Sequence, residues 1–89
     1  MPRETIRSLL LIDDDAGQRR LVSAIAARAG WRTVVADSGV TASTLLSAPA
    51  ASTIEAILID QQSADTPALV ADLRAAHPDK AVHVLTTLD

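Results

Sequence analysis

The sequence contains no cysteine, which excludes both a disulfide framework and a thiolate metal site. This absence is compatible with a reducing compartment, and we expect a cytoplasmic protein. Trp31 is the single aromatic residue, so the chain has no stacking platform for nucleic-acid bases. Any chemistry must therefore come from carboxylates, hydroxyl groups and the backbone.

Long hydrophobic runs and clusters of basic residues are also missing. The apolar run at residues 9–12 is too short to cross a bilayer, and the N-terminal stretch MPRETIRS lacks the apolar region of a signal peptide. A net charge of -3 and a pI near 5.1 argue against an electrostatic grip on nucleic acid. We expect neither membrane nor nucleic-acid binding, and 89 residues suffice for one domain over 1–89.

Short apolar runs alternate with segments of helical spacing, a pattern typical of βα units around a parallel sheet. We predict strands at 7–12, 33–36, 56–59 and 82–86, and a loop at 49–53. A first helix is predicted from an N-cap at Asp15 to a stop at Gly30, with positions 21, 22, 25, 26 and 29 facing inward. A second is expected near 40–47. A third has Thr66 as N-cap and Pro67 at its first position.

Polar residues follow each predicted strand, where ligands bind in parallel α/β sheets. In the commonest strand order the first strand lies beside the third, about 4.8 Å away, which brings Asp13 or Asp14 next to Asp60. Converging carboxylates repel one another, so such an array requires either a bound cation or retained protons. Oxygen ligands suit Mg²⁺. Helix capping explains Asp15 but not Asp13, and Asp60 taken alone could be an ordinary turn residue. The strand-end residues are Asp13, Asp14, Asp15, Asp37, Ser38, Asp60, Thr86 and Thr87.

In this order, LLLIDDDAGQRRLV, AILID and VHVLTT resemble the receiver domain of two-component response regulators. The stretch LVADLRAAHPDKAVHVLTT is similar to the third helix and fourth strand of that family. The resemblance covers nearly the whole chain and implies an α/β, flavodoxin-like three-layer sandwich with a parallel sheet in the order 2-1-3-4. The final helix, strand and helix of a full receiver are absent, so we expect a domain that is incomplete at its C-terminus.

The resemblance also implies a function in phosphorelay signal transduction rather than an enzyme activity. Asp60 would accept a phosphoryl group from a sensor histidine kinase or phosphotransfer protein. Mg²⁺ would be held by Asp14, Asp60 and the backbone carbonyl of Gln62, with Asp13 acting through water. Thr86 would then contact the phosphoryl group and act as the switch; the alternative is an ordinary β-branched strand residue.

Two departures from the family pattern leave other functions open. The segment QQSADTP after Asp60 contains no glycine, and the family's lysine is missing. Lys80, the only lysine, precedes the fourth strand and is therefore expected roughly 17 Å from Asp60. The alternative is a non-phosphorylated pseudo-receiver that binds proteins. For either function, the partners expected are an attached output domain or a dimer partner at an exposed fourth strand. A nucleotide-binding enzyme is disfavoured, because no glycine-rich loop follows the first strand.

Overall fold

The computed structural model describes residues 7–60 and 66–85. Strands and helices alternate along the chain, with one short 3₁₀ helix before the third strand. The elements are β1 (Arg7–Ile12), α1 (Ala16–Arg28), β2 (Trp31–Ala36), α2 (Gly39–Leu46), η1 (Pro49–Thr53), β3 (Ile54–Asp60), α3 (Thr66–Ala76) and β4 (Ala81–Leu85).

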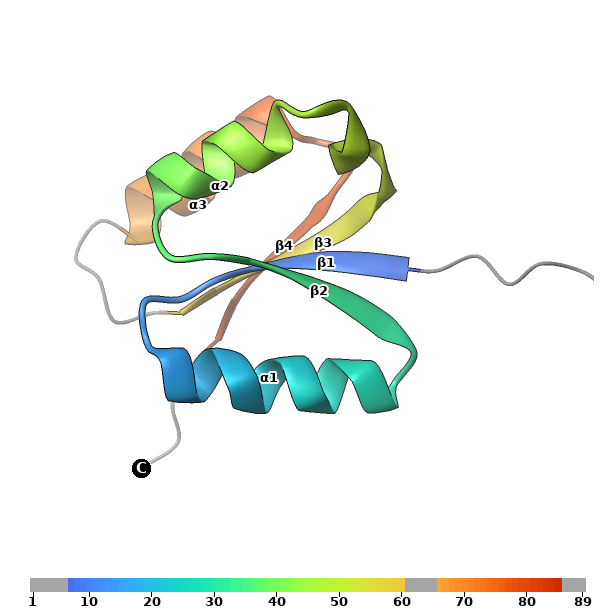
Figure 1. The fold of residues 1–89 in the computed structure, drawn as a ribbon. Helices are drawn as coiled ribbons and strands as arrows, with labels where there is room; N and C mark the ends of the chain where they lie inside the picture. Colours follow the sequence, from blue (N-terminus) through green and yellow to red (C-terminus); the bar gives the residue numbers. More distant parts are fainter. Residues whose placement is uncertain (1–6, 61–65, 86–89) are drawn as a thin grey trace, which may run out of the picture.

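The four strands form one sheet in the order β2-β1-β3-β4, and every neighbouring pair is parallel. Helix α1 covers one face of this sheet, while α2 and α3 cover the other (Figure 1). The predicted α/β, flavodoxin-like sandwich with strand order 2-1-3-4 is confirmed. In this order β1 and β3 are central, and β2 and β4 form the edges of the described sheet.

The predicted strands are confirmed, although two of them are longer than expected. β2 begins at Trp31 because its first residues pair with the start of β1, with Arg7 opposite Trp31. β3 extends from Ile54 to Asp60, since Ser8 of β1 pairs with its first residue and Leu85 of β4 pairs with its last. Pairing with a neighbour thus sets strand length, which single-strand patterns do not record. The predicted end of β4 at residue 86 lies outside the described residues.

Local signals at the two ends of α1 act as predicted. The Asp15 carboxylate accepts hydrogen bonds from the backbone N–H groups of Gly17 at 2.9 Å and Gln18 at 3.5 Å. These contacts satisfy two donors that have no partner inside the helix. After the helix, Gly30 has φ +90°, a left-handed conformation that glycine adopts without a steric penalty.

Two local predictions are wrong. Residues 49–53 form the 3₁₀ helix η1 instead of a loop, with Pro49 in its first turn, where a fixed φ favours helix initiation. Thr66 is the first residue of α3 rather than the cap that precedes it. Proline is tolerated anywhere in a first turn, so Pro67 does not prevent the helix from beginning one residue earlier.

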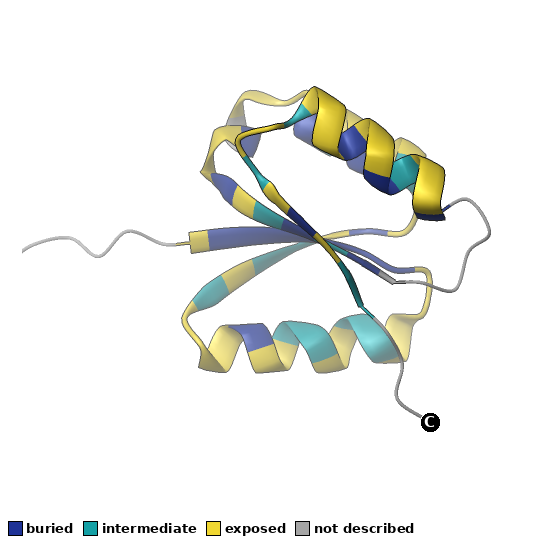
Figure 2. Ribbon diagram, turned by 180° about the vertical axis from the view of Figure 1, so that it is seen from behind, coloured by how far each residue is buried: buried dark blue, intermediate teal, exposed yellow. Residues whose placement is uncertain are grey.

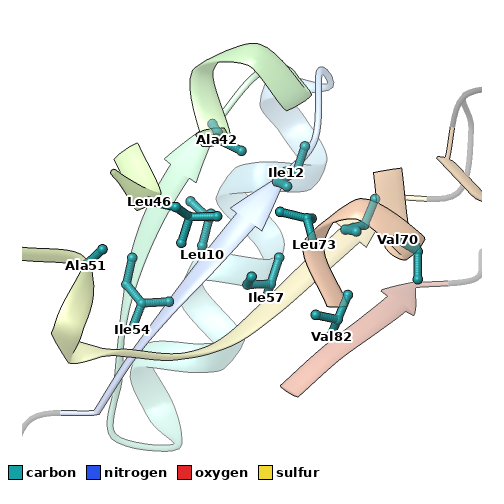
Figure 3. Close-up of a cluster of buried hydrophobic side chains, with 12 residues drawn as sticks. Leu10, Ile12, Ala42, Leu46, Ala51, Ile54, Ile57, Val70, Leu73 and Val82 are labelled. Carbon is teal, nitrogen blue, oxygen red and sulfur yellow. The ribbon is translucent and has the colours of Figure 1, made fainter. Parts of the chain in front are cut away.

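The main hydrophobic core lies between the sheet and the layer formed by α2, η1 and α3 (Figure 3). Leu10 and Ile57 stand at its centre, and both are fully buried. Leu46 of α2 and Leu73 of α3 pack into this cluster from the helix layer. Its buried members are Leu10, Ile12, Ala36, Ala42, Leu46, Ala51, Ile54, Ile57, Ile59, Val70, Leu73 and Val82.

The core beneath α1 is smaller, with Leu9, Leu11 and Ala26 as its buried members. The predicted inward stripe of α1 is wrong in part, because Leu21 and Ile25 are 61% and 60% exposed. These two residues lie four positions apart on one flank of the helix, whereas Ala26 meets the sheet. None of the described helices has the length and apolar character needed to cross a membrane.

Candidate functional site

The candidate site lies at the carboxyl ends of β1 and β3, which are adjacent in the sheet. Ile12 pairs with Ile59, so the residues that follow them, Asp13 and Asp60, stand at the same level of the two strands. The Asp13 N–H also donates to the carbonyl oxygen of Ala36 at 3.0 Å, which fixes it beside the end of β2. The backbone therefore brings together the strand ends that carry the acidic residues.

The three consecutive aspartates after β1 occupy three different environments. Asp13 is only 2% exposed, and its Oδ1 accepts a hydrogen bond from the Asp15 N–H at 2.8 Å. Asp14 is exposed, and Asp15 caps α1. A buried carboxylate is tolerated where hydrogen bonds or a cation compensate for its lost hydration. Besides the helix cap Asp15, the turn therefore places one buried carboxylate, Asp13, and one exposed carboxylate, Asp14, at the carboxyl end of β1.

Arg19 is a site residue that sequence reasoning missed. Its Nη1 donates to the main-chain oxygen of Asp13 at 2.9 Å in a partly buried contact. Helical side chains point back toward the helix N-terminus, so an arginine one turn into α1 can reach the turn before the helix. The signal available in the sequence was its spacing of four residues from the N-cap Asp15.

The polar residues after β2 serve to begin α2. The Ser38 hydroxyl caps this helix by accepting from the Thr41 N–H at 3.2 Å. The Thr41 hydroxyl donates to the Asp37 carboxylate at 3.0 Å. Because these contacts are local and exposed, Asp37 and Ser38 are accounted for by helix capping.

Lys80 lies at the opposite end of the sheet from Asp60. Its Nζ donates to the carbonyl oxygens of Ala51 at 3.0 Å and Ile54 at 2.7 Å, and Ile54 is the first residue of β3. The side chain is only 6% exposed and also lies 3.6 Å from the carboxylate of Asp79. Lys80 therefore secures the entry to β3 and is remote from the acidic site.

Two predicted site residues, Gln62 and Thr86, lie outside the described residues. Asp60 is placed by its backbone, as the last residue of β3 and the partner of Leu85. The structure thus locates Asp13, Asp14 and the backbone of Asp60 at the carboxyl ends of the two central strands.

The carboxylate oxygens at this end of the sheet are suitable ligands for a hard cation. Among the side chains that the structure describes, no three carboxylates, imidazoles or thiols are grouped closely enough to hold a metal ion. Mg²⁺ needs fewer protein ligands, because it keeps several waters and is commonly held by one or two carboxylates with a phosphate oxygen. The carboxylates of Asp13 and Asp14 supply the oxygen donors that this ion prefers.

Comparison with known proteins identifies the fold. The structure is similar to that of a response regulator from Thermotoga maritima, with a TM-score of 0.80 and 20% identity over 94% of this chain and 70% of the other. It is also similar to a response regulator receiver protein from Pseudomonas putida, with a TM-score of 0.77 and 20% identity over 98% of this chain and 74% of that one. The chain therefore has the receiver-domain fold that its sequence resembles. No family model matches it. The curated proteins give no match either.

Proposed function

We propose that this protein is a phosphoacceptor receiver of a two-component response regulator, with Asp60 as the acceptor. The carrying observation is the register of β1 and β3, which sets Asp13 and the backbone of Asp60 at one level on adjacent parallel strands. The receiver fold of the similar structures supports this general role. The proposed donor is a phosphohistidine on a sensor kinase or phosphotransfer protein.

The proposed reaction transfers one phosphoryl group. A carboxylate oxygen of Asp60 forms a bond to phosphorus while the phosphorus–nitrogen bond of the phosphohistidine breaks, and the product is an acyl phosphate. Asp13, Asp14, Asp60 and the backbone carbonyl of Gln62 would hold Mg²⁺, which supplies charge neutralisation for the transferring group. Asp13 is suited to a fixed role, because it is buried and hydrogen-bonded to the turn.

The proposal also includes the residue that would respond to phosphorylation, Thr86. Thr86 follows β4 directly and would donate a hydrogen bond to the new phosphoryl oxygen. Such a contact would shift the segment after β4 and signal to an attached output domain or a partner. This assigns the protein a role as a cytoplasmic switch and not as an enzyme.

The test is addition of beryllofluoride with Mg²⁺ to isotope-labelled protein, followed by amide NMR spectra. We expect shifts at Asp14, Asp60 and Thr86, which are lost in the Asp60→Asn variant. Asp37→Asn is the matched control, because this carboxylate lies after a strand but belongs to the α2 cap. A folded protein whose spectrum does not change with beryllofluoride and Mg²⁺ would contradict the proposal.

A second candidate is a pseudo-receiver that binds proteins without phosphorylation. It is favoured by the position of Lys80, whose ammonium group is bound to carbonyls at the far end of the sheet and cannot contact a phosphoryl group on Asp60. This alternative predicts that Asp60→Asn preserves partner binding. Loss of partner binding in that variant would favour the phosphorylated switch.

A further inference from the structure

The turn between β1 and α1 has a hydrogen bond on each of three successive peptide groups. The Asp13 N–H donates to Ala36 O at 3.0 Å, the Asp13 carbonyl accepts from Arg19 Nη1 at 2.9 Å, and the Asp15 N–H donates to Asp13 Oδ1 at 2.8 Å. Their partners come from β2, from α1 and from the turn itself. The orientation of this turn is therefore held from three sides.

The bond from Arg19 acts on the peptide group that joins Asp13 to Asp14. Rotation of that peptide changes the direction in which the Asp14 side chain leaves the backbone, since a planar peptide moves as one unit. Arg19 is itself anchored, because its own N–H donates to Asp15 O at 2.9 Å in the first turn of α1. Of the three bonds, this one can be removed without changing a candidate metal ligand.

We propose that Arg19 is a positioning residue for the cation site: it acts through the Asp13 carbonyl to hold the Asp13–Asp14 turn in its binding geometry before the cation arrives. This inference rests on the proposed function. Groups that hydrogen-bond to metal ligands and fix their orientation commonly affect metal affinity, although they do not contact the metal themselves. The two Asp carboxylates mutually repel, so a turn without this restraint would separate them.

A purely electrostatic role for Arg19 and a positioning role predict changes in Mg²⁺ affinity of opposite sign when the arginine is removed. A guanidinium group hydrogen-bonded to the Asp13 carbonyl repels a divalent cation that binds nearby, so its removal should strengthen Mg²⁺ binding. A positioning role predicts that removal weakens binding. The direction of the change therefore separates the two roles without reference to its size.

The test compares Arg19→Gln with Arg20→Gln in the full chain. Both variants remove one positive charge from the same turn of α1, but Arg20 is exposed and has no such bond to the turn among the described contacts. Mg²⁺ affinity is measured by calorimetric titration. We expect unchanged or slightly tighter binding in Arg20→Gln and roughly fivefold or greater weakening in Arg19→Gln. Arg19→Lys keeps a donor and the charge, and should recover part of the affinity.

A second measurement, made without metal, follows the hydrogen exchange of the turn amides. We expect the Asp15 amide to exchange at least about fivefold faster in Arg19→Gln, with the Leu10 and Leu11 amides unchanged. Faster exchange at Leu10 and Leu11 as well would indicate a general loss of stability and contradict a positioning role. Equal exchange of the Asp15 amide in both variants would also contradict it.

The outcomes separate this inference from the proposed function. Wild-type protein that fails to bind Mg²⁺ contradicts the proposed function and the metal role of Arg19 together. Wild-type protein that binds Mg²⁺, with Arg19→Gln binding as tightly as Arg20→Gln, overturns the positioning role alone and leaves the proposed function standing.

Discussion

The two faces of the sheet are made from the same strands but are covered to different extents (Figure 2). On the face covered by α2 and α3, buried residues extend from Ala36 on β2 across to Val82 on β4. On the face covered by α1, the buried residues are Leu9, Leu11 and Ala26, and of these only Leu11 is fully buried. Leu58 and Leu85, nearer the β4 edge, are only partly buried there.

This difference shows what a continuous apolar strand can and cannot determine. Strands such as LLLI in β1 are apolar on both faces, as expected for a parallel sheet covered by helices on both sides. The degree of burial then depends on how many helices reach each face. Two helices and η1 cover one face of the described structure, and one helix covers the other.

Polar contacts supplement the smaller core at the start of the sheet. The Arg7 guanidinium lies 4.3 Å from the centre of the Trp31 ring and forms an ion pair with Glu55 at 3.3 Å. These contacts connect the first residues of β1 and β2 with the second residue of β3. Both members of the ion pair are about half exposed, so its contribution is expected to be below about 1 kcal/mol.

The largest expected effect comes from truncating the centre of the larger core. Ile57→Ala should lower the free energy of unfolding by about 2–5 kcal/mol, because it leaves a cavity beneath α2 and α3. Leu58→Ala is the matched control on the same strand and the opposite face, and should cost clearly less because Leu58 is only partly buried. Urea unfolding measures both, and equal losses would show that the two faces are equally packed in solution.

An intermediate effect on the free energy of unfolding is expected for Lys80→Met, which tests the hydrogen bonds from Lys80 to η1 and to the start of β3. The substitution preserves the aliphatic stem but leaves the carbonyls of Ala51 and Ile54 without this donor, at a cost of about 1–3 kcal/mol. Asp79→Asn is the control, since it removes only the exposed ion-pair partner and should cost under about 1 kcal/mol. A Lys80→Met protein as stable as the wild type would show that these hydrogen bonds contribute nothing.

The smallest effect is expected on the exposed flank of α1. Leu21→Gln and Ile25→Gln should each change the free energy of unfolding by less than about 0.5 kcal/mol, because both side chains already contact solvent. Ala26→Gln is the contrasting variant, since Ala26 is buried against the sheet and has no room for a longer side chain. A loss above about 1.5 kcal/mol for Leu21→Gln would mean that this flank is covered in solution.

Elements with strong local signals were predictable from the sequence. Asp15 and Gly30 mark the two ends of α1. The N-cap requires only a short polar side chain, and the C-terminal stop requires only a residue that adopts a left-handed conformation. Strand order followed from the resemblance and from the usual topology of βα units. The positions of Asp13 and Asp60 at strand ends could be inferred for the same reason, since the end of an apolar run marks the end of a buried strand.

Only the tertiary structure decided which residues distant in the sequence contact each other and which way a given side chain faces. Lys80 binds carbonyls 26 and 29 residues earlier, and the exposure of Leu21 depends on which half of the sheet α1 covers. The bond from Arg19 to Asp13 requires the turn and the helix to meet at one angle. Local patterns encode caps, turns and periodicity because those interactions are made within a few residues. Burial and long-range hydrogen bonds arise only when whole elements pack together.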